Sequence, residues 1–167
     1  ACAGGGGKTL ALADLVGGEA KFHCCEIDVT KLEELLRRAE PLGLKSVTVH
    51  SISPSGPLPH TLPRNADIVV VDAPCSGSGS LRRSPDLKER YGEKDAAEFA
   101  ATQTSVLERF ATRVRPGGCL VYITCSILPD ENERVVRRFL EEHPEFDSER
   151  PELAERLPKA AVSPEGW

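Results

Sequence analysis

Apolar and polar positions follow two periods along the chain, which predicts strands alternating with helices. Short apolar runs of strand length lie at 21–27, 47–50, 67–71 and 119–124. Apolar residues at helical spacing mark 9–16, 31–39, 93–114 and a segment that opens at Pro129-Asp130 and runs through Leu140. Because the two kinds of element alternate, we expect an α/β fold with a mainly parallel sheet.

Turn-forming and capping residues supply the expected boundaries of these elements. The glycines at 17–18 close the first helix, and Asp28 or Thr30 caps the second. The Pro-Gly-Gly run at 116–118 predicts a sharp turn into the strand at 119–124. The Pro- and Ser-rich stretch 53–63 predicts a surface loop.

Length and composition favour about one globular domain. The 167 residues are 40% hydrophobic, which is enough for a core. There is no apolar run near the roughly 20 residues that span a bilayer, and no charged-then-apolar N-terminal signal pattern. We therefore expect a soluble, cytoplasmic protein.

The net charge of −5 does not favour nucleic-acid binding by the molecule as a whole. Most local basic groups are typical of a solvated helix face. Arg82 and Arg83 differ, because they lie close to a cysteine motif and Arg side chains match phosphate geometry. The alternative for this pair is a surface salt bridge to Asp86 or Glu89.

The six cysteines are expected to be free thiols. Several lie in or beside strand-like runs, and the chain has neither a Cys-x-x-Cys pair nor a His at zinc-ligand spacing, so no metal site is expected. Cys24, Cys25 and Cys119 are expected to be small core residues.

Cys75 and Cys125 occupy matching settings. Cys75 follows the apolar run 68–71 within Asp-Ala-Pro-Cys-Ser-Gly, and Cys125 follows the run 120–123 within Thr-Cys-Ser. In a doubly wound sheet, ligands bind just beyond the carboxyl ends of the parallel strands. Because both thiols are expected at that edge of the sheet, we predict that they take part in a reaction and are not core packing residues.

The glycine-rich run 4–7, followed by Lys8-Thr9, resembles a phosphate loop. It fails the Walker A test, because the required first glycine is Cys2. Glycines still permit close backbone approach, and a helix N-terminus favours an anionic group. Glu26, about 20 residues downstream, suits the ribose of a nucleoside-containing cofactor. The alternative is a purely structural turn.

Taken together, these motifs resemble one family. They are Cys-Ala-Gly-Gly-Gly-Gly-Lys-Thr at 2–9, Asp-Ala-Pro-Cys-Ser-Gly-Ser-Gly at 72–79 with Arg-Arg-Ser-Pro-Asp at 82–86, and Tyr-Ile-Thr-Cys-Ser at 122–126 with Glu-Asn-Glu at 131–133. The chain is similar to the RsmB/Nop/Sun family of RNA cytosine-5 methyltransferases from residue 1 to about residue 144. The form of its glycine loop is most like that of bacterial, RsmB-like members.

The resemblance implies a Rossmann-like class I methyltransferase sheet and S-adenosylmethionine as cofactor. It implies a partial catalytic domain at 1–144, followed by a Pro-rich, charged segment at 145–167. Cys125 would attack cytosine C6, Cys75 would assist product release, Asp72 would hydrogen-bond the cytosine, and Lys8 would lie near cofactor and base. The residues implied in cofactor binding are Cys2, Ala3, Gly4, Gly5, Gly6, Gly7, Lys8, Glu26, Ser53 and Asp72. Arg82 and Arg83 would contact RNA, ribosomal rather than transfer RNA.

The chain departs from the family pattern in several places. Ser53 stands where the family usually has a cofactor-binding Asp. The family's first strand would precede residue 1, and its last strands and an RNA-binding extension lie beyond these residues. Because an incomplete sheet leaves buried backbone groups unpaired, we expect residues 1–167 not to fold stably alone. Circular dichroism and thermal unfolding test this, and a cooperative transition with native-like helix content would refute it.

Two further functions remain open from the sequence. One is a non-catalytic RNA-binding or ribosome-assembly protein that keeps the methyltransferase fold, which Ser53 favours. The other is methylation of a protein or small molecule, which leaves the paired cysteines unexplained.

Overall fold

The strands form two parallel pairs. β1 (Phe22–Glu26) pairs with β2 (Val47–Ser51), and β3 (Ala66–Asp72) pairs with β4 (Val114–Ile123).

This computed structural model describes residues 1–16, 20–85 and 93–149, and for residues 93–95 it describes the backbone alone. The expected closure of the first helix at 17–18 and the expected partners Asp86 and Glu89 lie outside these residues.

The chain divides into two compact units. The first comprises Ala1–Pro74 and Ser105–Thr124, and the second comprises Cys75–Thr104 and Cys125–Trp167. All four strands belong to the first unit. The boundary predicted at residue 144, between a catalytic domain and a Pro-rich segment, is not one of the boundaries between these units, and it stays a prediction.

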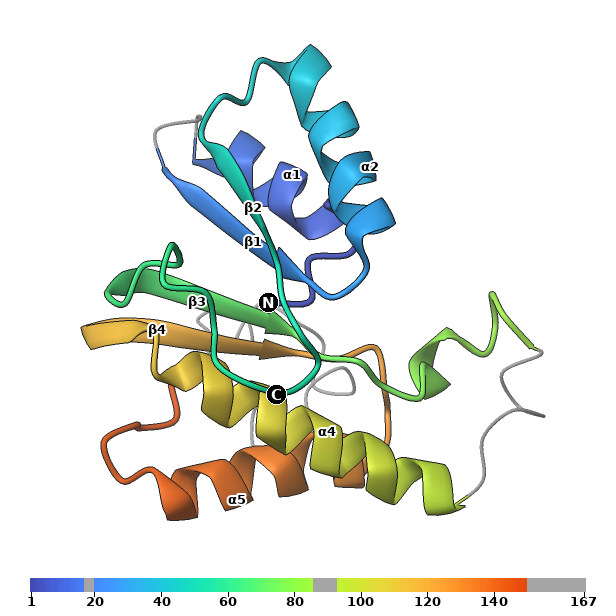
Figure 1. The fold of residues 1–167 in the computed structure, drawn as a ribbon. Helices are drawn as coiled ribbons and strands as arrows, with labels where there is room; N and C mark the ends of the chain where they lie inside the picture. The colour runs from blue at the N-terminus through green and yellow to red at the C-terminus, as the bar shows by residue number, and fades with distance from the viewer. Residues whose placement is uncertain (17–19, 86–92, 150–167) are drawn as a thin grey trace. The chain divides into compact units, whose positions relative to one another are not determined.

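Helices make the crossovers that parallel strands require. Between β1 and β2 the chain forms α2 (Val29–Ala39), and between β3 and β4 it forms α4 (Glu93–Ala111) (Figure 1). Asp28 caps α2, because its carboxylate accepts from Thr30 N at 3.0 Å. The sequence had left Asp28 and Thr30 as alternatives, and the structure selects Asp28.

Residues 1–3 lie between the two strand pairs. Ala3 N donates to Cys25 O of β1 at 3.0 Å, and on the other side Asp72 N of β3 donates to Ala1 O at 3.3 Å. The glycine loop and α1 (Gly7–Leu15) follow directly. The loop therefore starts between the carboxyl ends of β1 and β3, where a cofactor is expected to bind.

The helix predicted at 93–114 ends at Ala111, so its predicted end is wrong by several residues. Val114 instead begins β4, opposite Ala66. The next pairing after an irregularity is Ile68 with Cys119, so the predicted Pro-Gly-Gly turn lies within the first part of this strand. Gly118 fits there because an added Cβ would lie 2.9 Å from Asp67 O. Local periodicity could not reveal this long-range pairing.

Two of the three predicted core cysteines are confirmed. Cys24 and Cys25 of β1 are buried, but Cys119 is exposed, so its placement in the core was wrong. Cys119 lies at the irregular start of the β3–β4 pairing. A strand-like run does not reveal which of its faces is covered.

The second unit contains η2 (Ser78–Ser80), η3 (Pro129–Glu131) and α5 (Glu133–Glu142). Val135 and Phe139 of α5 are buried, as its helical spacing predicts. Among the described residues, no helix has both the length and the apolar character needed to cross a membrane.

Candidate active site

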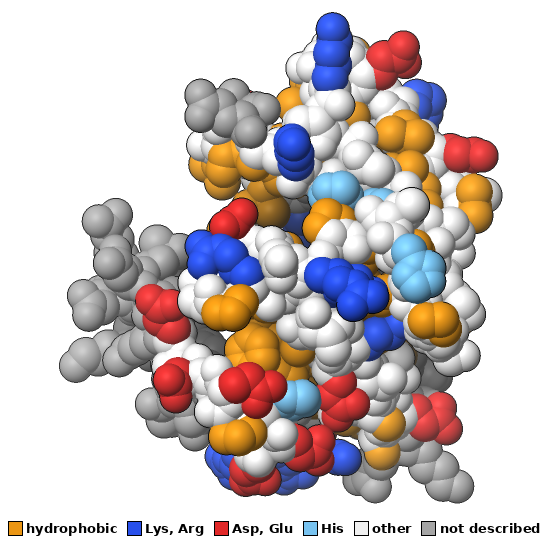
Figure 2. All heavy atoms as spheres, turned by 60° about the vertical axis from the view of Figure 1, so that its left-hand side comes forward, with side chains coloured by type: hydrophobic (Ala, Val, Ile, Leu, Met, Phe, Trp, Pro, Cys, Tyr) orange, Lys and Arg blue, Asp and Glu red, His pale blue; other side chains and the backbone are white. Residues whose placement is uncertain are grey.

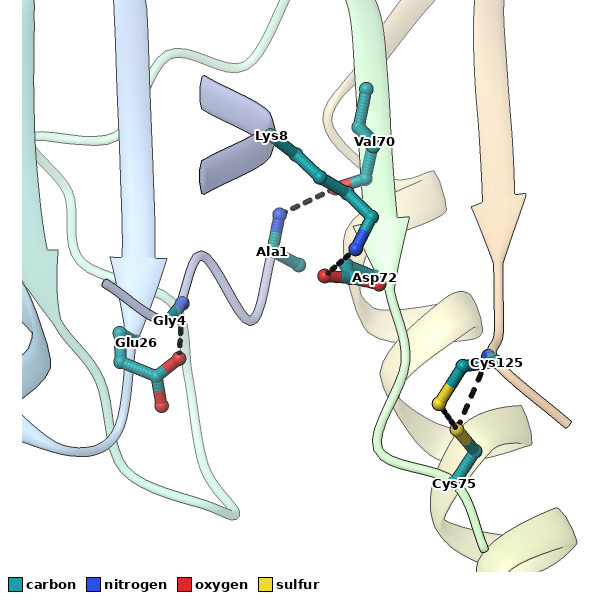
Figure 3. Close-up of polar contacts among 8 residues, drawn as sticks. All are labelled: Ala1, Gly4, Lys8, Glu26, Val70, Asp72, Cys75 and Cys125. Carbon is teal, nitrogen blue, oxygen red and sulfur yellow. Dashed lines mark hydrogen bonds and ion pairs between the residues drawn. The ribbon is translucent and has the colours of Figure 1, made fainter. Parts of the chain in front are cut away.

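Cys75 and Cys125 are brought together in the second unit. Their Sγ atoms lie 3.1 Å apart, and Cys125 N also donates to Cys75 Sγ at 3.3 Å (Figure 3). All six cysteines of the chain are free thiols in the structure, which confirms that expectation. Cys125 is exposed and Cys75 is half-buried, so the pair is open to a ligand.

Burial and the hydrogen bond with Cys125 raise the pKa of Cys75 to about 11. At neutral pH the Cys75 side chain is therefore a thiol, able to donate its proton toward the Cys125 sulfur. Burial also raises the pKa of Cys25 to about 11, but that thiol is enclosed in the core. Among these thiols, only the Cys75–Cys125 pair combines mutual contact with access.

A buried hydrogen-bond network underlies the two cysteines, and its members had no role assigned from the sequence. Glu131 is 0% exposed, and its carboxylate accepts from Ser76 N at 2.9 Å, from Ser126 Oγ at 2.8 Å and from Gln103 Nε2 at 2.8 Å. It also accepts from Ser76 Oγ. A sequence signal did exist: Gln103 interrupts the apolar helical row of Phe99 and Leu107, and a buried amide needs a polar partner.

Lys8 and Asp72 form an ion pair in the first unit. Lys8 Nζ lies 2.6 Å from Asp72 Oδ2 (Figure 3). The two side chains are 52% and 32% exposed. Asp72 is the last residue of β3, and Lys8 lies in the first turn of α1. Both groups are therefore presented to solvent and to any ligand at that strand end.

The glycine loop is joined to Glu26 at the end of β1. Gly4 N donates to Glu26 Oε2 at 2.8 Å (Figure 3). Ile27 N donates to the other oxygen, Oε1, at 2.9 Å. Gly6 has a φ of +84°, and an added Cβ would lie 2.6 Å from Leu35 Cγ, so only glycine fits this turn. Gly6 has no side chain to cap α1, which leaves the first N–H groups of the helix facing the loop.

Ser53 and the flanking residues Cys2 and Ala3 complete the predicted cofactor set. Ser53 follows β2 and is exposed, and its carbonyl accepts from Arg109 Nη1 at 2.9 Å. Cys2 has a φ of +52°, an uncommon value outside glycine, so the backbone at the entrance to the loop is strained. Burial raises the pKa of the Cys2 thiol, which keeps it neutral.

Arg82 and Arg83 lie in the second unit, just after η2. Together with Gly79 and Ser80 they line a hollow of about 380 Å³. On the face drawn in Figure 2, Lys and Arg side chains are interspersed with Asp and Glu rather than gathered in one large patch. The local arginines, and not the overall charge, are therefore the feature suited to a phosphate.

The family model for 16S rRNA methyltransferase RsmB/F matches residues 1–163. The chain belongs to this family. It is 34% identical over 159 residues to a probable ribosomal RNA small subunit methyltransferase B of Bacillus subtilis, covering 95% of this chain and 35% of that protein. The chain thus spans about a third of the length of this RsmB relative.

Solved structures agree with the family assignment. PH0851 superposes with a TM-score of 0.80 at 35% identity, covering 89% of this chain and 34% of that one. NSun6 from Pyrococcus horikoshii with SFG, an analogue of S-adenosylmethionine, gives 0.71 at 27% identity, covering 83% and 35%. The predicted RsmB/Nop/Sun resemblance and the predicted Rossmann-like methyltransferase fold are both confirmed.

Proposed function

We propose that the protein methylates C5 of cytosine in RNA, on ribosomal RNA, with S-adenosylmethionine as methyl donor. The observation that carries this proposal is the contact between Cys75 and Cys125, whose sulfur atoms lie 3.1 Å apart in a chain of the RsmB/F family. Nitrogen or oxygen methylation needs no thiol, whereas methylation at an unreactive ring carbon does.

Cys125 is the proposed nucleophile. Its Sγ forms a bond to cytosine C6, which turns C5 into an enamine-like carbon that can accept a methyl group. This covalent route replaces one difficult step with two easier ones. The cytosine must be unstacked or single-stranded to present C6 to an exposed thiol.

Cys75 is the proposed group for release of product. In the resting site its pKa of about 11 keeps its proton in place. Once Cys125 is bonded to C6, it can no longer hold negative charge or accept from the Cys75 thiol, so part of that elevation disappears. The Cys75 thiol can then lose its proton to solvent, and the resulting thiolate takes the C5 proton. The C5–H electron pair re-forms the C5=C6 double bond, and the Cys125–C6 bond breaks with Cys125 leaving as a thiolate.

Asp72 and Lys8 are proposed to act on the base and its charge. The Asp72 carboxylate would accept a hydrogen bond from the amino group of the cytosine and so orient the ring, and the positive charge of Lys8 would stabilise the negative charge that develops there. Lys8, 2.6 Å from that carboxylate in the structure, would hold Asp72 in place and add positive charge.

The glycine loop and its neighbours fit the cofactor. When bound, S-adenosylmethionine supplies an electrophilic methyl group. The uncapped N-terminus of α1 suits its carboxylate, and Glu26 suits its ribose hydroxyls. Cys2, Ala3, the glycines at 4–7 and Ser53 would line the same site. Glu26 is 6% exposed and already bonded to Gly4 N, so it would hold the loop and the ribose together.

Arg82 and Arg83 are proposed to bind phosphates of the RNA in the hollow that they line. Such contacts fix the position of a strand without reading its sequence. Substituting either arginine should weaken RNA binding and make it less sensitive to salt.

A non-catalytic RNA-binding role is the second candidate. Ser53 favours it, because this position lacks the carboxylate expected in the family's cofactor site. Titration calorimetry of the full-length protein with S-adenosylmethionine separates the two proposals. Absence of binding would support the non-catalytic role.

The direct experiment is transfer of radiolabelled methyl from S-adenosylmethionine to ribosomal and transfer RNA by the full-length protein. Cys119→Ala is the matched control for Cys125→Ala, because Cys119 is also an exposed thiol delivered by β4. We expect 5-methylcytosine in ribosomal RNA with wild type and Cys119→Ala, and none with Cys125→Ala. Full turnover by Cys125→Ala would exclude the proposed mechanism.

A further inference from the structure

Glu131 joins the two loops that carry the cysteines. Ser76 directly follows Cys75, and Ser126 directly follows Cys125. Both serines donate side-chain hydrogen bonds to the Glu131 carboxylate, and Ser76 also donates its backbone N–H at 2.9 Å. One buried carboxylate is thus bonded to the neighbours of both thiols, within a single unit of the structure.

The network also fixes the carboxylate itself. Gln103 Nε2 of α4 donates to Glu131 Oε2 at 2.8 Å, and η3 supplies the backbone that carries Glu131. The Ser126 hydroxyl lies 2.9 Å from Ser78 Oγ, which accepts in turn from Ile127 N. The loop after β3 and the loop after β4 are therefore held from several sides around one acceptor.

The carboxylate is ionised at neutral pH. Burial alone would raise the pKa of Glu131, but the hydrogen bonds from Ser76, Ser126 and Gln103 outweigh it and hold the pKa below its ordinary value. Hydrogen bonds to an ionised acceptor are about twice as strong as those between neutral groups. A neutral amide at this position would also turn one acceptor into a donor facing the Ser76 N–H or hydroxyl groups.

We propose that Glu131 is a positioning residue that sets the separation of the Cys75 and Cys125 sulfur atoms. It acts through Ser76 and Ser126, the residues that directly follow the two cysteines. This inference deepens the proposed function and rests on it. Release of product requires the Cys75 thiol to lie beside the cytosine carbon atoms at which Cys125 reacts. If Glu131 had only a structural role, its substitution would lower the stability of the protein without changing the separation of the two sulfur atoms.

The test is formation of a Cys75–Cys125 disulfide by diamide in the full-length protein, quantified by peptide mass spectrometry. The two thiols lose two electrons and two protons, and diamide takes up both to become the hydrazine. We expect Glu131→Gln to slow this reaction about tenfold or more, since small displacements of paired reactive groups cost large factors in rate. Glu141→Gln, an exposed glutamate on α5, is the matched control and should leave the rate unchanged.

Methyl-transfer kinetics give the second readout. We expect kcat for Glu131→Gln to fall by about 10², as for a displacement of about 1 Å, while KM for RNA changes by less than about threefold. If Glu131→Gln has wild-type rates of disulfide formation and turnover, the proposal is wrong, even if its melting temperature is lower. If the variant does not fold, Ser126→Ala decides, because it removes one hydroxyl and keeps the bonds from Ser76. Unchanged disulfide formation in that variant would also overturn the proposal.

The two claims can fail separately. Disulfide formation needs neither RNA nor cofactor. If it slows in Glu131→Gln while the wild type transfers no methyl to RNA, the positioning role stands and the proposed function falls.

Discussion

At the scale of single residues, Cys75 and Cys125 are chemically unlike although their local sequences are similar. Cys75 is half-buried and accepts from Cys125 N, whereas Cys125 is exposed. Burial and the hydrogen bond with Cys125 raise the pKa of Cys75 to about 11, which keeps Cys75 protonated at neutral pH. The sequence predicted that both thiols reach one sheet edge. It could not predict the raised pKa of Cys75, because that depends on burial and on a contact with a residue 50 positions away.

The first prediction concerns the pH dependence of Cys75 alkylation. In wild type the iodoacetamide labelling rate of Cys75 should keep rising with pH toward about 11. In Cys125→Ala the midpoint should fall, because the hydrogen bond to Cys125 that raises the pKa is lost. It should stay above 9.0, because burial, the larger cause, remains. Peptide mass spectrometry measures both profiles, and identical profiles would contradict the assigned contact.

The second prediction separates catalysis from stability at Asp72. Asp72→Asn should lower methyl transfer by about 10², because the neutral amide loses the ion pair with Lys8 that holds it in place, and a misplacement near 1 Å costs about that factor. Its free energy of unfolding should change by less than about 1 kcal/mol, because the Lys8–Asp72 pair is partly exposed.

Asp67→Asn is the control for Asp72→Asn. Asp67 also lies on β3 and also forms an ion pair, because its Oδ1 lies 2.7 Å from Arg115 Nε. Urea unfolding and single-turnover kinetics of both variants make the comparison. Equal losses of activity in the two variants would show that Asp72 has no special role.

At the scale of elements, the close approach of two loops shapes the cysteine site. Gly79 N of η2 donates to Cys125 O at 2.9 Å, and an added Cβ at Gly79 would lie 2.7 Å from that same oxygen. Glycine is therefore required for the loop after β3 to lie against the loop after β4. The sequence showed a Ser-Gly-Ser-Gly run, but it gave no sign that the second glycine faces Cys125.

The third prediction follows from this approach. Gly79→Ala should separate the two loops, because the clash is with rigid backbone, and kcat should fall by about 10² for a displacement near 1 Å. Ser80→Ala, one position along in η2, should leave the rate of Cys75–Cys125 disulfide formation, which needs no RNA, at the wild-type value. Rates of methyl transfer and of Cys75–Cys125 disulfide formation should fall together in Gly79→Ala. A fall in neither would contradict the geometry of η2.

At the scale of the whole molecule, the alternation of strands and helices predicted the fold class, and the family comparison confirmed it. Local pattern failed where distant segments decide the structure. Val114 belongs to β4 because it pairs with Ala66, and Cys119, where the pairing resumes after the irregularity, is exposed. The hydrogen bonds of Glu131 were not predicted for the same reason: its partners come from three other segments of the chain.

The fourth prediction links the cofactor to stability. S-adenosylmethionine at about 100 times its Kd should stabilise the full-length protein by about 2.7 kcal/mol. Glu26→Gln should weaken cofactor affinity by about tenfold or more, since hydrogen bonds to a charged group contribute about 1.5–3 kcal/mol. Glu33→Gln, an exposed acid on α2, is the control. Thermal shift and calorimetry measure the effect, and equal affinity in both variants would remove Glu26 from the cofactor site.

The central claim is that Cys125 forms a covalent bond to cytosine and that Cys75 resolves it. Its most direct test is to incubate full-length wild type, Cys75→Ala, Cys125→Ala and Cys119→Ala with ribosomal RNA and labelled S-adenosylmethionine, and then run a denaturing gel. The account predicts a protein–RNA adduct that accumulates in Cys75→Ala, no adduct in Cys125→Ala, and wild-type behaviour in Cys119→Ala. An adduct that persists in Cys125→Ala, or methylated RNA made by that variant at the wild-type rate, would contradict it.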